Sequence, residues 1–516
     1  MSDRHSGDSN RSPTRSRVFR LTTIAASGLG SFALALWAVR SGVGGIDGIP
    51  ANIVAGMIAA LCALAASFAA MSFFAGIDES ASWVYRETQF DKLTGLSTRA
   101  AMAGRVAEAA TGAIGTGRPV FLLDIDIDRF KHINDTIGYS DGDRLVHAFA
   151  ERLKEILPRE AEIGRISAGE FAVLIPDRPD LGSMDAFIGR IYERLTQPYQ
   201  LPSHLQSVNM SVGLVAIPKD GTEPVTLLRR ANLALQHARG GGIGNWSAFH
   251  EQMGRVADYR QWIESELHVA FRRGDFELHY QPQFDLSTGR TVGYEALVRW
   301  RHPERGMVPP GEFVPVAEET GMIVPIGEWV LRKACEDARF LPQDCFVAVN
   351  ISPVQFMTRD FLSMVSGVIA STGIDPKRLE LEVTETAMMQ DRAHAAAILD
   401  ALSQMNISVA VDDFGTGYSN LSYLVDFPFK KLKIDQSFVR RLESDNNSGA
   451  VVSTIVGLSR ALGVRTIAEG VETESQATLL KAAGCQVGQG YLFGKPGPLV
   501  MRDGRLEPRH DAATVH

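Results

Sequence analysis

The chain has 516 residues, which is too long for one ordinary hydrophobic core and predicts several domains. Hydrophobic residues make up 45% and charged residues 22%, a mixture typical of globular proteins. The formal net charge of −8 argues against a nucleic-acid polymer as partner, because such binding neutralises phosphates with an excess of lysine and arginine. The scattered cysteines form no CxxC pair, so a zinc site is not expected.

Two almost uncharged stretches follow a basic tail that spans residues 1–20. Residues 21–39 and 53–77 are each long enough to cross a hydrocarbon layer as a helix, so 21–77 is predicted to contain two transmembrane helices. The alternative for the first stretch is a cleaved signal peptide, which the second apolar stretch close behind disfavours. Arginines crowd the tail, and the positive-inside tendency places the N-terminus in the cytoplasm. We expect a two-pass protein in contact with membrane lipid, with its other domains in the cytoplasm.

A connector, residues 78–90, is predicted to be helical and leads into a region of alternating strands and helices, 91–250. Residues 120–127 fit a buried strand, 162–176 a hairpin and 225–239 a helix. This alternation predicts an α/β sandwich built over a sheet.

The motifs DKLTGL, FKHIND and GYSDGD within 91–250 resemble the GGDEF family of diguanylate cyclases. The resemblance implies that Asp126 binds a metal ion and that Asn134 and Asp143 contact a guanine base. Those residue types suit a base edge, because a carboxylate accepts hydrogen bonds and a carboxamide can both donate and accept them.

The signature hairpin departs from the family pattern, since Ser167–Phe171 reads SAGEF where the family has two glycines and two acids before the phenylalanine. Gly169 stands where the family has an acid that holds metal and activates the attacking hydroxyl. The arginine expected just before Asn245 is missing, and an RxxD product-inhibition motif is not cleanly present. We therefore predict a degenerate GGDEF domain without cyclase activity. A GTP-binding regulator and a folded spacer both remain open as its role.

The region 259–498 repeats a pattern of strand, loop and helix, and eight apolar runs are suited to strands. These runs are FELHYQP, TVGYEALVRW, FVAVNIS, LELEVTE, ISVAVDDF, FKKLKID, RTIAEGV and QVGQGYLF. Eight strands with helical crossovers in a region of this length predict an α/β barrel of the TIM type, (β/α)8. The first connection, 285–290, is short, so the first two strands are predicted to pair as an antiparallel hairpin. The residues 499–516 are left as a tail.

Polar residues end most of these strands, where barrel enzymes keep their chemistry. They are Glu295, Asn350, Glu382, Asp412, Asp413, Lys433 and Glu469. A buried carboxylate without a partner costs several kcal/mol, and two adjacent aspartates repel each other unless a cation neutralises them. Oxygen ligands without cysteine or histidine suit Mg²⁺ or Mn²⁺. The pattern predicts a rim that holds divalent metal ions and a phosphodiesterase activity.

The motifs YQP, YEALVRW, NIS, LEVTE, DDFGTGYSNL, KIDQSFV, AEGVE and GYLFGKP resemble, in the right order, the EAL family of cyclic di-GMP phosphodiesterases. The resemblance implies hydrolysis of cyclic di-GMP to linear pGpG in a bacterial inner-membrane protein. It also implies a homodimer through the EAL domains, the GGDEF domains or both. Two Mg²⁺ or Mn²⁺ ions are expected in each site. The implied ligands are Glu295, Asn350, Glu382 and Asp412 for one ion, and Asp412, Asp413 and Glu469 for the other.

The resemblance also implies roles in catalysis and substrate binding. Lys433 and Glu469 would hold or deprotonate the attacking water, together with the catalytic Glu295. Arg299 would bind a substrate phosphate, for which its guanidinium fork is suited. Glu385 would anchor the loop that follows the two aspartates. Two glutamines complete the expected substrate-binding set, Gln281 and Gln489.

Two other functions stay open at this point. One is a cyclic di-GMP receptor that no longer hydrolyses its ligand. The presence of every implied metal ligand argues against it. The other is a bifunctional enzyme that also makes cyclic di-GMP, against which Gly169 argues.

Overall fold

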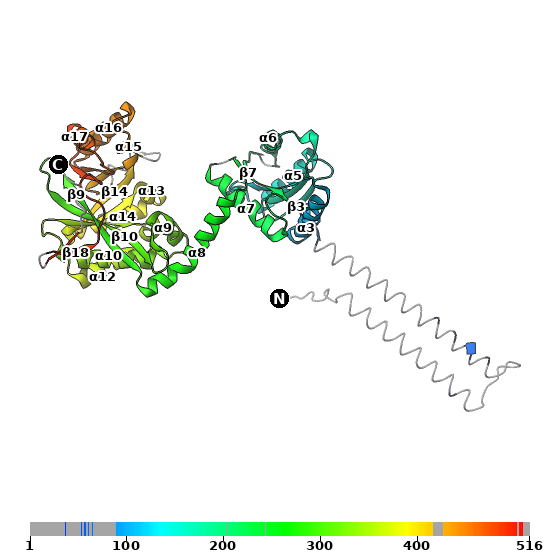
Figure 1. The fold of residues 1–516 in the computed structure, drawn as a ribbon, viewed down its shortest axis with the longest axis horizontal. Coiled ribbons are helices and arrows are strands. Elements are labelled where there is room, and N and C mark those ends of the chain that lie inside the picture. Colours follow the sequence, from blue (N-terminus) through cyan, green and yellow to red (C-terminus); the bar gives the residue numbers. More distant parts are fainter. Residues whose placement is uncertain are drawn as a thin grey trace, which may run out of the picture. The chain divides into compact units, whose positions relative to one another are not determined.

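The structure is a computed structural model, and it describes residues 89–202, 204–242, 244–415, 427–502 and 505–508 together with a few single residues before residue 65. Nearly all of the predicted membrane hairpin, 21–77, lies outside these residues, as does most of the predicted helical connector. No helix among the described residues combines the length and the apolar character that crossing a membrane requires. The chain contacts define two units, Met1–Gly254 and Arg255–His516. Each is described by itself (Figure 1).

The first unit is an α/β sandwich around a six-stranded sheet with the order β1-β3-β4-β2-β7-β8. The strands are β1 (Ser97–Thr98), β2 (Val120–Ile127), β3 (Glu162–Arg165), β4 (Glu170–Pro176), β7 (Met210–Ile217) and β8 (Trp246–Ala248). A separate two-stranded ribbon is formed by β5 (Tyr199–Gln200) and β6 (Leu205–Gln206). The predicted strand at 120–127 is β2, and the predicted hairpin is β3 with β4.

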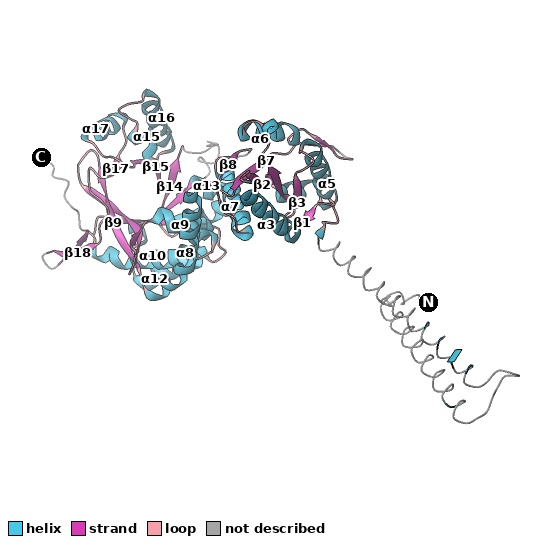
Figure 2. Ribbon diagram, turned by 45° about the vertical axis from the view of Figure 1, so that its right-hand side comes forward, coloured by secondary structure: helices cyan, strands magenta, loops and turns pink. Residues whose placement is uncertain are grey.

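Helices cover both faces of this sheet (Figure 2). They are α3 (Arg99–Thr116), α4 (Phe130–Ile137), α5 (Tyr139–Ile156), α6 (Met184–Leu195) and α7 (Pro224–Gly240). The central strand β2 shows why two layers form. Leu123 and Ile125 pack in the core that contains α5 and α6, whereas Leu122 packs in the core that contains α3 and α7. This two-residue period is that of a strand buried on both faces.

The second unit is a closed eight-stranded barrel in which one strand runs opposite to its neighbours. Its strands are β9 (Phe276–Asp285), β10 (Thr291–His302), β12 (Phe346–Ile351), β13 (Leu379–Thr384), β14 (Ser408–Phe414), β15 (Lys431–Ile434), β16 (Arg465–Ala468) and β17 (Val487–Gln489). The strands from β10 to β17 are parallel, and β9 closes the barrel by antiparallel pairing with both β10 and β17.

The predicted antiparallel hairpin of the first two strands is confirmed. The barrel differs from a regular (β/α)8 barrel in the reversed direction of β9, as this hairpin requires. The connection from β9 to β10 is a short turn and leaves no room for the crossover helix that a parallel pair requires. The reversal brings polar side chains of β9 beside those of both neighbouring strands, with consequences for the site below.

The connecting helices pack around the barrel. They are α8 (Glu251–Arg273), α9 (Pro310–Glu319), α10 (Ile323–Asp337), α11 (Pro353–Phe356), α12 (Phe361–Thr372), α13 (Glu385–Gln390), α14 (Arg392–Gln404), α15 (Gln436–Arg440), α16 (Asn446–Leu462) and α17 (Glu474–Ala483). Short 3-10 turns lie at η1 (Pro179–Leu181) in the first unit and at η2 (Ala338–Phe340) and η3 (Pro376–Arg378) in the second. The remaining strands are short. They are β11 (Gly306–Val308) and the two strands of a separate ribbon, β18 (Leu499–Arg502) and β19 (Arg505–Pro508).

Strand β13 shows how the barrel separates apolar from charged side chains. Leu379, Leu381 and Val383 join the large hydrophobic core shared with the helices. Glu380 and Glu382 alternate with them and therefore face the interior of the barrel. Both glutamates are almost fully buried, so the barrel interior must supply them with partners.

Candidate active site

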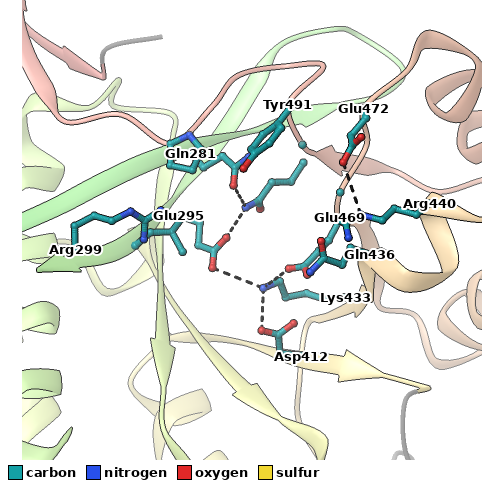
Figure 3. A pocket seen from close by; sticks show the side chains of 15 residues that line it. Gln281, Glu295, Arg299, Asp412, Lys433, Gln436, Arg440, Glu469, Glu472 and Tyr491 are labelled. Carbon is teal, nitrogen blue, oxygen red and sulfur yellow. Dashed lines mark hydrogen bonds and ion pairs between the residues drawn. The ribbon is translucent and has the colours of Figure 1, made fainter. Parts of the chain in front are cut away.

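The ammonium group of Lys433 lies at the centre of the charged groups inside the barrel (Figure 3). Its Nζ is 2.6 Å from Glu382 Oε2, 2.6 Å from Glu469 Oε1, 3.1 Å from Asp412 Oδ2 and 4.0 Å from Glu295 Oε1. These side chains come from β10, β13, β14 and β15 and from the end of β16, which converge at one mouth of the barrel. The structure therefore brings together five residues that the sequence places far apart.

This centre carries an excess of negative charge, because one ammonium faces four carboxylates. Burial raises the pKa of Glu469 to about 8, although Lys433 acts in the opposite direction. Burial also raises the pKa of Glu382 well above its usual value, and the neighbouring carboxylates add to the rise. The pKa of Lys433 is lowered by burial, but the surrounding carboxylates outweigh this and raise it. A further positive charge would relieve the repulsion.

A network of amide side chains holds Glu295. Asn350 Nδ2 donates to Glu295 Oε1 at 2.5 Å, and Gln489 Nε2 donates to Glu295 Oε2. Gln489 Nε2 also donates to Gln281 Oε1 at 3.0 Å, and Gln283 Nε2 donates to Gln489 Oε1 at 2.9 Å. Gln489 of β17 lies opposite Gln283 of β9, and Gln281 of β9 lies opposite Glu295 of β10, a register that depends on the reversal of β9. The sequence interpretation missed Gln283, although its two-residue spacing from Gln281 places both on one face of the strand.

Two predicted residues lie outside this contact network. Asp413 has a left-handed φ of 56°, and its backbone N–H donates to Asp412 Oδ1 at 2.9 Å. Its carboxylate is not among the four that contact Lys433, and burial together with Asp412 raises its pKa. Glu385 is buried at the start of α13. Most of the loop that it is predicted to anchor, 416–426, lies outside the described residues, so that role stays a prediction.

A cavity of about 320 Å³ opens above the charged centre. Arg299 lines it together with Gln281 and Gln489, as expected for substrate-binding residues. Burial lowers the pKa of Arg299, while Glu295 acts in the opposite direction. Four polar side chains in its lining were not predicted: Gln436, Arg440, Glu472 and Tyr491. The position of Tyr491, two residues after Gln489 and beyond the end of β17, could have indicated that it lines the cavity.

The predicted division of the ligands between two metal ions stays a prediction. Among the residues that the structure describes, no three acidic, histidine or cysteine side chains are arranged to hold a metal ion. Lys433 takes the central position among the carboxylates. The chemistry of the donors nevertheless suits a hard cation, since all are oxygens in negative surplus. In the described part of the chain, Glu382 Oε1 is buried without a hydrogen-bond partner, which leaves an acceptor for such an ion.

The first unit holds a second cavity, of about 520 Å³, at the end of β2. Asp126 lines it and forms an ion pair with Arg239 of α7. Burial raises the pKa of Asp126 to about 6, although Arg239 acts against the rise. Asn134 also lines this cavity, whereas Asp143 is exposed on α5 and is absent from the lining. Of the three predicted GTP-site residues, the structure thus brings two together.

Comparisons with known proteins identify both domains. Residues 264–496 match the family model of the EAL domain, and residues 88–244 match that of the diguanylate cyclase, GGDEF domain. The chain therefore belongs to the family of tandem GGDEF–EAL proteins.

Sequence matches to named relatives extend over most of the chain. The chain is 37% identical over 412 residues to the bifunctional diguanylate cyclase/cyclic di-GMP phosphodiesterase MucR of Pseudomonas aeruginosa, covering 79% of this chain and 60% of MucR. It is 33% identical over 442 residues to the cyclic di-GMP phosphodiesterase NbdA of the same species, covering 85% of this chain and 56% of NbdA. The chain thus spans little more than half the length of these relatives.

A solved structure shows the same fold. It is the S helix–GGDEF–EAL portion of Vibrio cholerae LapD, bound to cyclic di-GMP. The match has a TM-score of 0.53 and 20% sequence identity, and it covers 81% of this chain and 100% of that one. At this identity the likeness concerns the fold alone.

Proposed function

We propose that the EAL barrel hydrolyses cyclic di-GMP to linear pGpG. The observation that carries this proposal is the cluster of four carboxylates around Lys433 beneath an open cavity that Arg299 lines. The named phosphodiesterase relative and the EAL family match support the same substrate.

The residues of the barrel have different roles in the proposed reaction. Mg²⁺ or Mn²⁺ ions, when bound, supply charge that activates water and stabilises the transition state at phosphorus. The residues that would hold them are Glu295, Asn350, Glu382, Asp412, Asp413 and Glu469. Arg299 binds a phosphate oxygen through its guanidinium fork. Lys433 and Glu469 orient the attacking water, and Glu469 accepts its proton. The water oxygen bonds to phosphorus, the bond to the ribose 3′-oxygen breaks, and that oxygen then takes up a proton.

The test is to incubate the full-length protein with cyclic di-GMP and Mg²⁺ and to measure pGpG. We expect turnover, and we expect Glu295→Ala to lower it about a hundredfold or more, since this side chain is held by hydrogen bonds from two other strands. Glu277→Ala is the matched control, because Glu277 pairs with Arg301 outside the cavity. Binding of cyclic di-GMP without turnover would reject hydrolysis and leave the receptor function.

For the GGDEF domain we propose a regulator that binds GTP without converting it. Gly169 supplies no carboxylate, and Asp126 already has Arg239 as its partner. The bifunctional alternative is rejected if the protein forms no cyclic di-GMP from GTP.

We also propose a two-pass inner-membrane protein that acts as a homodimer, on the basis of the apolar stretches within 21–77 and of the family. Membrane fractionation tests the location. Light scattering of the purified full-length protein tests the dimer.

A further inference from the structure

The cavity in the GGDEF domain, named here the Arg239 cavity, has more cationic than anionic side chains in its described lining. Arg129, Lys131 and Arg239 line it, and Asp126 is the one carboxylate in its described lining. The rest of the lining includes the hairpin residues Ser167, Ala168 and Gly169. A cavity with more positive than negative groups favours an anionic ligand over a free cation.

The metal ion that the family implies at this place does not fit the residues present. The guanidinium of Arg239 pairs with Asp126, so the carboxylate already has a cation. Gly169 has no side chain, and a Cβ there would lie 3.0 Å from Cγ of Phe130. The next acid, Glu170, accepts a hydrogen bond from Ser167 Oγ at 2.9 Å. A divalent cation needs several oxygen ligands, and the described lining of this cavity offers one carboxylate, which is already paired with Arg239.

We propose that the Arg239 cavity binds a nucleoside polyphosphate without a divalent cation, with Arg239 supplying the charge that a metal supplies in an active cyclase. This rests on the proposed role of the domain as a GTP-binding regulator and adds to it the chemistry of binding. Charge-assisted hydrogen bonds from arginine and lysine hold phosphate oxygens directly. With a single carboxylate in the lining, the phosphates meet little repulsion that an ion would have to screen.

Asn134 offers a polar group for the base in the same cavity. Asn134 lines it, and Asn134 Oδ1 has no hydrogen-bond partner among the described residues. A buried carboxamide with an unused acceptor has capacity for the polar edge of a ligand. Its neighbour Gly142 makes this arrangement feasible, since a Cβ there would lie 1.8 Å from Asn134 Oδ1.

The experiment measures GTP binding to the full-length protein by calorimetry, once with Mg²⁺ and once with EDTA. We expect the two dissociation constants to agree within about twofold. Arg239→Ala should weaken binding about tenfold or more in both conditions, and Arg239→Lys should recover part of the loss. Asp126→Asn should bind GTP at least as tightly as the parent, because it frees Arg239 and removes a negative charge. Arg229→Ala, an exposed position on the same helix, is the matched control.

Several outcomes would overturn the proposal. They are GTP binding that requires Mg²⁺, no GTP binding in either condition, unchanged binding by Arg239→Ala, or loss of binding in Asp126→Asn. Hydrolysis of cyclic di-GMP, measured on the same preparations, reports on the EAL barrel separately. The two measurements therefore distinguish a wrong proposal for the Arg239 cavity from a wrong proposal for the phosphodiesterase function. The EDTA comparison needs no substitution and stands even if a variant folds poorly.

Discussion

Both domains place a basic side chain against the acids that their families use for metal, but the balance of charge differs. In the barrel, Lys433 faces four carboxylates. In the GGDEF domain, Arg239 faces Asp126 alone in the lining of its cavity. The first arrangement keeps a large negative surplus, whereas in the second the pair of Arg239 and Asp126 is neutral by itself. We infer that a basic residue near a proposed metal position does not by itself exclude the metal, and we expect the number of acids around that residue to decide whether a cation binds.

Removal of divalent cations should give the largest difference between the two domains in their functions. With EDTA we expect hydrolysis of cyclic di-GMP to fall to background, because the surplus carboxylates repel the phosphate unless cations neutralise them. GTP binding in the same sample should persist. Product chromatography and calorimetry measure the two effects.

Addition of Mg²⁺ or Mn²⁺ in excess should restore hydrolysis, and Ca²⁺ should not, because its coordination is larger and looser. Hydrolysis that survives complete chelation would contradict the assignment of the acidic centre as a metal site.

Lys433→Met should make the stability of the barrel depend on metal. The substitution leaves buried carboxylates without their one cation, and breaking a buried ion pair costs about 3–5 kcal/mol. We expect a clear fall of Tm in EDTA and a partial recovery with Mg²⁺. Differential scanning calorimetry with and without the ion measures the difference.

Lys431→Met is the matched control for this prediction. Lys431 is also buried on β15, but its ion pair is with Glu380 alone, at 2.8 Å. Its loss should destabilise the barrel to the same extent in EDTA and in Mg²⁺. Equal metal dependence in both variants would show that the surplus charge around Lys433 does not govern cation binding.

The barrel strands and most of the candidate site were within reach of sequence reasoning, because each strand is an apolar run that ends in a polar residue. The run LELEVTE is β13, and the alternation in it already separates Glu380 and Glu382 from the core. Family motifs then suggested the roles of the acids. The roles themselves stay predictions until they are tested.

The central place of Lys433 could not be predicted in this way. It depends on the distances between the ends of five different strands, which no local pattern contains. The pairing of Arg239 with Asp126 was missed for the same reason, since one lies on α7 and the other on β2. The role of Gln283 could not be predicted either. Its partner Gln489 becomes its neighbour only because β9 pairs with β17 and closes the barrel.

Gln283→Leu should lower kcat about tenfold and leave KM nearly unchanged. Gln283 touches neither the charged centre nor the cavity, but it fixes the carboxamide of Gln489, which donates to Glu295. Supporting hydrogen bonds of this kind are worth about 10–100-fold in activity or metal affinity. Steady-state kinetics at saturating Mg²⁺ measures both constants. A change in KM alone would instead place Gln283 in substrate binding.

Gly169→Glu should have the smallest effect, because restoring the missing acid should not restore cyclase activity. Phe130 occupies the space beside position 169, and Arg239 still neutralises Asp126. The assay is best done in the Glu295→Ala background, where any cyclic di-GMP formed from GTP would accumulate. We expect none with Mg²⁺. Accumulation would mean that a single carboxylate suffices to displace Arg239 and admit a metal ion. In that case the neutral pair would be as open to cations as the surplus acids of the barrel, and the contrast between the two domains would fail.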